Sequence, residues 1–327
     1  MKELIQNFPL QLEEAIQIGK SYKSNLPKSG YANVVVSGLG GSGIGADLVR
    51  EYVAPHLSVP FIVSKDYVIP NFINSNTLFI ASSYSGNTEE TLESIKVAIK
   101  KKAKIVCITS GGKLAEIAKK NKFDLILIPG GNPPRSCLGY SFVQQLFILK
   151  NAVLLKIDFE KELLASIALL RKDEKSIKKE AEKIAKNIFD KTPVIYAIDG
   201  NAAVAVRFRQ QVNENGKQLC WHHIVPEMNH NELVAWRTKD EKLAVVIFRN
   251  ETDNKRSQVR VELNKKIIKE YTKTIIEIWS KGNSYLERAM YLIHLGDWAS
   301  WHLSELRNFD CTEVKVIDWL KGELAKV

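Results

Sequence analysis

The first half of the chain alternates short apolar runs with helical stretches, and this alternation restricts the possible folds more than any other feature. The runs are rich in Val and Ile and continuously apolar, as expected for strands buried on both faces of a sheet. They lie at residues 34–37, 61–63, 77–81, 105–108 and 125–128, with helical stretches at 44–52, 89–100 and 114–121. This β-α-β repetition predicts a parallel sheet with helices on both faces.

The second half of the chain repeats the pattern on a smaller scale. Residues 139–190 have helical character, and the Lys- and Glu-rich part of this stretch is typical of a solvated connecting helix. Strand signals return at 193–198, 243–248 and 274–278, and two helices are expected at 284–307 and 312–324. We therefore predict an α/β protein of two subdomains, 1–155 and 192–327, joined by a helical connection at 156–191, each with a mainly parallel sheet flanked by helices.

Charge and composition restrict the partners. The 327 residues carry a formal net charge of +10, but Lys and Arg are spread along the chain and form no basic patch, so no nucleic-acid partner is expected. No apolar run approaches the ~18–20 residues that span a membrane, and Glu3, Glu13 and Glu14 interrupt the region where a signal peptide is apolar. A cytoplasmic location is expected. The four cysteines are far apart and form no CxxC pair, so neither a zinc knuckle nor a redox motif is present. No metal and no cofactor are expected.

A glycine-rich segment, residues 38–45, directly follows the first predicted strand and begins a helix. Glycines let a backbone approach a ligand closely, and the free N–H groups of a helix N-terminus favour an anion. The segment satisfies GxGxxG, the dinucleotide fingerprint, which also requires an acid at the end of the second strand. That strand ends in Ser64-Lys65-Asp66, where the acid comes late and a lysine precedes it. NAD binding is therefore disfavoured.

A second polar segment follows the third predicted strand. The hydroxyl groups of Ser83, Ser85 and Thr88 surround a glycine at a strand-to-helix turn and can bind a phosphate without a metal. Asn87 and Glu90 also fit a capping box, so the segment could be only a helix cap. Two such loops without a Walker lysine or Mg²⁺ ligands favour a sugar phosphate over ATP.

Five separated motifs together resemble one family. They are SYSGNTEET at 83–91, GLGGSGIGAD at 38–47, PPR at 133–135, NENGK at 213–217 and PEMNHNE at 226–232. In their order along the chain they are similar to the bifunctional phosphoglucose/phosphomannose isomerase family, a branch of the SIS-domain sugar isomerases, over nearly the whole chain. The resemblance implies an aldose–ketose isomerase that interconverts glucose 6-phosphate and fructose 6-phosphate, and also mannose 6-phosphate, through a cis-enediol without a metal.

The resemblance also assigns roles to residues. It implies that Glu214 is the base that moves the proton between C1 and C2, that His230 opens the sugar ring, and that Arg135 binds substrate and stabilises the enediolate. The substrate-binding residues that it implies are Gly41, Ser42, Ser83, Ser85 and Thr88.

The end of the chain resembles the closing helix of the family. The active-site lysine of that helix is placed on Lys321, with Lys315 as a rival, and Thr312 is nearest to a threonine associated with dual specificity. In relatives the ring-opening histidine comes from a second subunit, so the resemblance implies a homodimer with shared sites.

Two other functions stay open at this point. A non-catalytic phosphosugar-sensing SIS protein would keep the serine-rich loop but need not keep Glu214 and His230. A nucleotide-linked oxidoreductase is disfavoured by the missing ribose-binding acid.

Overall fold

The computed structural model describes residues 1–324 and 326, which form two compact units. The N-terminal unit consists of Gln6–Arg171 together with Asn283–Glu287. The C-terminal unit consists of Met1–Ile5, Lys172–Gly282 and the chain from Arg288 onward. The long helix α7 (Phe159–Ile188) contains one of the points at which the chain passes from one unit to the other. Each unit is described below by itself.

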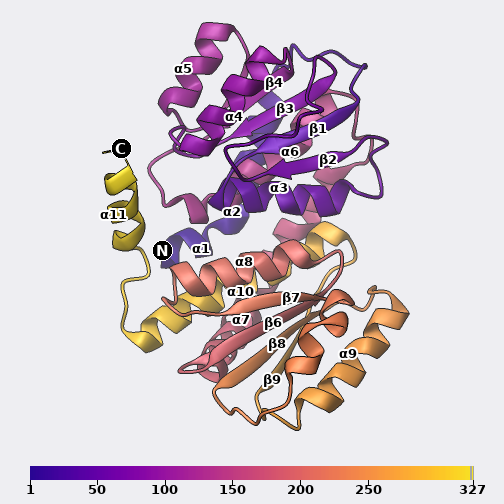
Figure 1. Ribbon diagram of the computed structural model, residues 1–327, viewed down its shortest axis with the longest axis vertical. Helices are drawn as coiled ribbons and strands as arrows, with labels where there is room; N and C mark the ends of the chain where they lie inside the picture. Colours follow the sequence, from indigo (N-terminus) through magenta and orange to yellow (C-terminus); the bar gives the residue numbers. More distant parts are fainter. Residues whose placement is uncertain (325, 327) are drawn as a thin grey trace. The chain divides into compact units, whose positions relative to one another are not determined.

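The N-terminal unit is built on a five-stranded sheet in the order β2-β1-β3-β4-β5, in which all pairs are parallel (Figure 1). Its strands are β1 (Asn33–Ser37), β2 (Phe61–Ser64), β3 (Thr77–Ser82), β4 (Lys104–Thr109) and β5 (Asp124–Leu127). The three central strands are almost completely buried. This confirms the parallel sheet expected from continuous apolar runs, because helices cover both faces.

The helices of the N-terminal unit form two groups that pack on the sheet. Residues of α4 (Glu89–Lys100) and α5 (Gly112–Asn121) pack with alternate residues of β1, β3 and β4 in one apolar cluster. The helices α2 (Phe8–Ser21) and α3 (Gly40–Val53) each pack against α6 (Leu138–Asn151). Because α3 leads from β1 to β2 while α4 leads from β3 to β4, the chain diverges between the carboxyl ends of β1 and β3. Ligands of open α/β sheets bind at such a point.

The C-terminal unit repeats this plan with four parallel strands in the order β7-β6-β8-β9. They are β6 (Thr192–Ile198), β7 (Trp221–Val225), β8 (Leu243–Arg249) and β9 (Ile275–Trp279). The helices of this unit are α1 (Lys2–Gln6), α8 (Ala202–Glu214), α9 (Lys255–Ile268), α10 (Tyr285–Arg307) and α11 (Lys315–Leu324), with short 3₁₀ turns at Glu227–His230 and Glu232–Ala235. The two-sheet α/β architecture agrees with the prediction.

Several elements were not predicted. Strand β7 contains His222 and His223 and lies at the sheet edge, half-buried, so its sequence lacks the apolar run of a central strand. Helix α9 is strongly polar and begins at an Asn254 cap, whose side chain accepts hydrogen bonds from the N–H groups of Arg256 and Ser257. Edge strands and solvated helices bury little apolar surface, so their periodicity is weak. Among the described residues, no helix combines the length and the apolar character needed to cross a bilayer.

Candidate active site

The first loop joins β1 to α3 and presents backbone rather than side chains. Helix α3 begins at Gly40, and Leu39 at its N-cap supplies no side-chain hydrogen bond. Ser42, in the first turn, is buried. A Cβ atom on Gly41 would lie 2.8 Å from the carbonyl oxygen of Pro134, so only glycine allows the loop to approach the segment that carries Arg135 this closely. The first turn of α3 and the Arg135 segment are therefore neighbours.

The second loop gathers the predicted hydroxyl groups around a tight turn. The Ser83 and Thr88 hydroxyl oxygens are 2.8 Å apart, and Ser83 Oγ also accepts a hydrogen bond from the Gly86 N–H at 3.1 Å. Ser85 Oγ accepts from the N–H of Asn87 at 3.2 Å. Ser83 is buried and Ser85 is exposed. The structure thus holds these hydroxyls in one turn at the carboxyl end of β3.

The predicted capping box at the start of α4 is wrong. Thr88 is the N-cap and makes no side-chain cap, because its hydroxyl bonds to Ser83. The side chain of Asn87 instead accepts a hydrogen bond from the N–H of Lys113. Glu89, which would repel a phosphate if it pointed inward, accepts a hydrogen bond from the Tyr67 hydroxyl at 3.2 Å. The helix N-terminus therefore keeps N–H groups without a side-chain cap, as an anion site requires.

Arg135 lies in the short 3₁₀ turn Pro134–Ser136, which follows β5, and its side chain is buried. The loop that carries it is tied to the serine loop, because the N–H of Asn132 donates to the Tyr84 hydroxyl at 3.1 Å. Burial raises the pKa of Tyr84 to about 12, so this hydroxyl stays protonated. The glycine loop, the serine loop and the Arg135 segment thus meet at the carboxyl edge of the first sheet.

An ion pair that the sequence did not predict lies at this carboxyl edge of the first sheet. The ammonium group of Lys65, directly after β2, contacts the buried carboxylate of Asp47 in α3. A dinucleotide-binding sheet would have an acid at the end of this strand to bind a ribose. A cation at this position does not fit that role.

Glu214 is the last residue of α8 in the C-terminal unit and is half-buried. The turn that follows it is anchored by neutral side chains. Asn215 is fully buried and donates to Ser300 Oγ of α10 at 2.9 Å, and Asn213 donates to the carbonyl oxygen of Gln218 at 2.7 Å. The signal for this rigid turn was present in the sequence as asparagines that flank the glutamate.

His230 ends the 3₁₀ turn Glu227–His230 and is exposed. The chain on either side of it is anchored by the buried Met228 and Trp236, which pack in the core of this unit. Glu232 fixes the next turn, because its carboxylate accepts hydrogen bonds from the Tyr196 hydroxyl at 2.5 Å and from the Trp221 indole at 3.2 Å. Burial raises the pKa of the Tyr196 hydroxyl, which therefore remains a donor.

The second sheet lies between the segments that carry Glu214 and His230. Phe208 of α8 packs edge-on against Phe248 of β8, with ring centroids 5.5 Å apart. Met228 and Trp236 instead pack in one cluster with Ile247, the neighbour of Phe248 along β8. Successive residues of a strand face opposite sides of the sheet. Helix α8 and the His230 segment therefore lie on opposite faces (Figure 1).

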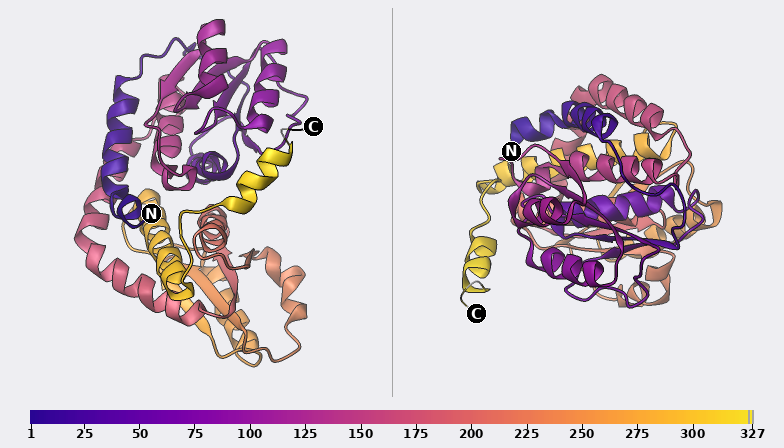
Figure 2. Two further views of the ribbon diagram at one scale, coloured as in Figure 1. Left: turned by 90° about the vertical axis from the view of Figure 1, so that its left-hand side faces the viewer. Right: turned by 90° about the horizontal axis from the view of Figure 1, so that it is seen from above.

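The C-terminal candidates lie at the end of the chain on an exposed helix. Helix α11 has no buried residue, and both Lys315 and Lys321 are exposed. Thr312 precedes the helix and its N–H donates to the Asp310 carboxylate at 2.7 Å. Figure 2 shows α11, in yellow, after an extended link that follows α10. Lys321 and its rival Lys315 therefore both remain candidates for the active-site lysine.

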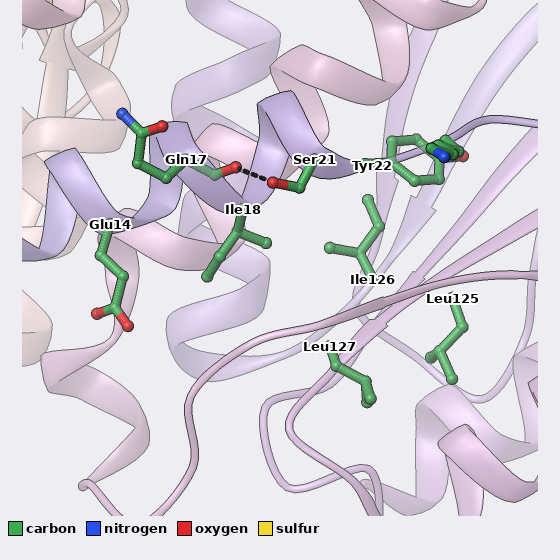
Figure 3. Close-up of a pocket in the computed structure, with 9 residues that line it drawn as sticks. Glu14, Gln17, Ile18, Ser21, Tyr22, Leu125, Ile126 and Leu127 are labelled. Atoms are coloured by element: carbon green, nitrogen blue, oxygen red, sulfur yellow. Dashed lines mark hydrogen bonds between the residues drawn. The ribbon is translucent and has the colours of Figure 1, made fainter.

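A hollow of about 440 Å³ in the N-terminal unit lies away from the predicted residues. Figure 3 shows that it lies between α2 and the edge strand β5, with Ile18, Ile126 and Leu127 along it. None of the predicted site residues lines it. Within the part of the chain that the structure describes, no cluster of three or more His, Cys, Asp or Glu side chains is arranged to hold a metal ion.

The fold and its loops define a tandem SIS-domain protein. Residues 30–155 match the SIS domain family, and residues 177–324 match the family described as the bacterial phospho-glucose isomerase C-terminal SIS domain. The C-terminal domain of glucosamine-fructose-6-phosphate aminotransferase from Francisella tularensis has a similar structure, with a TM-score of 0.78, 16% identity and coverage of 96% of this chain and 98% of that one.

Curated relatives identify the branch. A bifunctional phosphoglucose/phosphomannose isomerase of Caldicellulosiruptor bescii is 40% identical over 100% of this chain and 99% of its own length. The enzyme of the same name from Aquifex aeolicus is 37% identical over 90% of this chain and 91% of its own length. The chain belongs to the bifunctional phosphoglucose/phosphomannose isomerase family, as the five motifs indicated.

Proposed function

We propose that this protein is an aldose–ketose isomerase that interconverts glucose 6-phosphate, fructose 6-phosphate and mannose 6-phosphate through a cis-enediol, without a metal. The observation that carries this proposal is the set of loops at the carboxyl edge of the first sheet, where uncapped helix N-termini, hydroxyl groups and a buried arginine meet. A cytoplasmic location is part of the proposal, because sugar phosphates are charged and do not cross membranes unaided.

In this proposal the loops at the carboxyl edge of the first sheet supply phosphate binding and charge. The N–H groups of the first turn of α3, with Gly41 and Ser42, and the hydroxyls of Ser83, Ser85 and Thr88 bind the phosphate. Arg135 cannot lose its proton, and it stabilises the negative charge that develops on the enediolate oxygens. A preorganised buried guanidinium acts more strongly than one in water because the local dielectric constant is low.

Glu214 and His230 carry out proton transfer in this proposal. Glu214 removes the proton from C2 of the aldose and returns it to C1, so that one carboxylate serves both directions of the reaction. His230 protonates the ring oxygen and opens the pyranose or furanose before this step. A lysine of α11, Lys321 or Lys315, adds positive charge near the substrate.

We further propose a homodimer in which each active site takes Glu214 from one chain and His230 from the other. The placement of α8 and the His230 segment on opposite faces of the second sheet supports this arrangement. A packed sheet separates the two side chains within one chain, so one substrate molecule is expected to meet them from two copies. Cyclic C₂ dimers, the commonest oligomers, provide this kind of reciprocal exchange.

A direct assay tests the proposed function. Purified protein should convert fructose 6-phosphate to glucose 6-phosphate and mannose 6-phosphate to fructose 6-phosphate, each followed by a coupled reduction of NADP. The rates should be unchanged after dialysis against EDTA, because the proposed groups are all protein side chains. Loss of turnover in EDTA that a divalent metal restores would contradict metal independence, and the absence of turnover on both substrates would contradict the function.

A further inference from the structure

We propose that Lys217 is a positioning residue that fixes the C-terminal segment, residues 310–324, to the turn that carries Glu214. This inference rests on the proposed function, in which Glu214 is the base and a lysine of α11 contributes to the site. The motif at 213–217 includes Lys217, but the roles proposed above leave it unused.

The ammonium group of Lys217 joins two distant parts of the chain. It donates a hydrogen bond to the carbonyl oxygen of Glu214 at 2.6 Å and another to the carbonyl oxygen of Glu313 at 2.5 Å. The Glu313 carboxylate lies 3.6 Å from the same nitrogen. The side chain is only 19% exposed, so these contacts are partly shielded from water. One acceptor belongs to the proposed base and the other lies two residues before α11.

The backbone at this position favours a different residue. Lys217 has a φ of +51°, in the left-handed region that glycine commonly occupies just after a helix. A side chain in this region is strained, because its Cβ atom crowds the following carbonyl oxygen. A glycine would adopt this conformation without that strain but could not reach Glu313. The side chain is therefore explained by the bridge rather than by the helix end.

The turn provides a rigid anchor. Asn215 is buried and bonds to Ser300, and Gly216 packs so tightly on α10 that a Cβ atom would lie 2.6 Å from Leu303 Cδ2. The far partner of the bridge is less embedded. Helix α11 has no buried residue, and its side chains Val316 and Trp319 are 79% and 65% exposed. The buried Cys311 and the bridge through Lys217 both hold this segment.

The bridge therefore fixes the proposed base and the α11 lysine relative to the same turn. The Glu214 carbonyl that accepts from Lys217 belongs to the same residue as the proposed catalytic carboxylate. Movement of residues 310–314 away from this turn would displace Lys315 and Lys321 together. A displacement of about 1 Å can reduce turnover ~100-fold even when no catalytic group is lost.

The test replaces Lys217 with Met, which keeps the length of the side chain and the same backbone cost but removes the charge and all three donors. Hydrogen exchange of amides 311–324, followed by mass spectrometry, should accelerate ~10- to 100-fold, the change expected for loss of a charged hydrogen bond. The kcat for fructose 6-phosphate should fall ~10- to 100-fold while KM changes less than about threefold. Lys217→Arg, which keeps the donors and the charge, should leave both the exchange of 311–324 and kcat close to their wild-type values.

The matched control is Lys191→Met. Lys191 also donates to a backbone carbonyl, that of Glu241, at 2.6 Å in the same unit, but its acceptor lies outside the C-terminal segment. It should change neither the exchange of 311–324 nor kcat. Normal exchange in Lys217→Met would overturn the bridge, and faster exchange with normal kcat would overturn the positioning role. An inactive wild-type protein would instead overturn the proposed function, while the exchange measurement would still decide the bridge.

Discussion

Three glutamates close together in the sequence have different surroundings in the structure. Glu232 accepts hydrogen bonds from Tyr196 and Trp221, which fix it as a structural group. Glu227 is exposed and accepts from the side chain of Asn231 at 3.0 Å. Glu214 is half-buried at the end of α8, beside the anchored turn. Of the three, Glu214 therefore best fits a base held in a defined place.

Glu214→Gln tests this assignment because it keeps the shape of the side chain and removes the proton acceptor. General-base catalysis contributes ~10²–10⁴-fold, so kcat for fructose 6-phosphate should fall by about that factor while KM stays near the wild-type value. Exchange of the C2 hydrogen with deuterated solvent, measured by NMR, should fall in parallel.

Glu227→Gln is the matched control for this prediction. It changes an exposed carboxylate of the His230 segment and should leave kcat and exchange within about threefold of wild type. Near-normal turnover and exchange in Glu214→Gln would show that another group is the base.

The hydroxyls of the serine loop make a second prediction at the residue scale. The double variant Ser85→Ala, Thr88→Ala removes two hydroxyls from the turn at the carboxyl end of β3. Contacts to phosphate are the same in the ground state and the transition state, so their loss should raise KM more than it lowers kcat. Each lost hydrogen bond to a charged group corresponds to about 1.5–3 kcal/mol, so KM should rise by at least ~10-fold.

Steady-state kinetics with fructose 6-phosphate measures this change. Ser176→Ala, which removes a hydroxyl that donates to the Asp173 carbonyl within α7, is the control and should leave KM unchanged. If the double variant keeps the wild-type KM, the serine loop has only a structural role at the start of α4.

At the scale of elements, α8 is held on α10 by a buried ion pair. Arg207 is 2% exposed and Asp297 6%, and the guanidinium donates to both carboxylate oxygens, at 3.2 and 2.9 Å. This bidentate geometry fixes both the rotation and the axial position of the helix that ends in Glu214. Removal of one partner leaves a buried charge without its partner, which is far more costly than removal of both.

We therefore predict that Asp297→Ala lowers the free energy of unfolding by about 3–5 kcal/mol. The double variant Arg207→Met, Asp297→Leu should lower the free energy of unfolding much less. All six tryptophans lie in the C-terminal unit, so tryptophan fluorescence during urea unfolding follows this unit selectively. Equal destabilisation in the single and the double variants would show that the pair does not behave as a coupled buried charge pair.

At the scale of the whole molecule, the placement of Glu214 and His230 on opposite faces makes a prediction about mixed dimers. The variants Glu214→Gln and His230→Ala should each be nearly inactive as homodimers. After the two are mixed, unfolded and refolded together, half of the dimers contain one chain of each kind. One of the two sites in such a dimer has an intact Glu214 and an intact His230, so the mixture should regain about a quarter of wild-type activity.

A sedimentation measurement accompanies this experiment and should give about twice the 36.9 kDa chain mass. If the mixture stays as inactive as its components, each chain uses its own Glu214 and His230, and the proposal of shared sites fails.

The sequence alone determined the two parallel sheets and most of the strands, because continuous apolar runs separated by helices can be buried in few other ways. It also marked the glycine and serine loops, since glycine and hydroxyl patterns act locally. The edge strand β7 and the polar helix α9 were not predicted, because elements that bury little apolar surface have only a weak hydrophobic periodicity.

Tertiary structure decided what depends on contacts between distant residues. The Asn87–Glu90 capping box is absent because Thr88 bonds to Ser83 and Asn87 bonds to Lys113, from another helix. Two contacts join separate segments of the chain: the Lys65–Asp47 pair and the bridge from Lys217 to Glu313. The burial of Arg135 likewise depends on the segments that pack around it. Local sequence patterns carry no record of such pairings, because the partner of a side chain is fixed only when the packed layers bring both together.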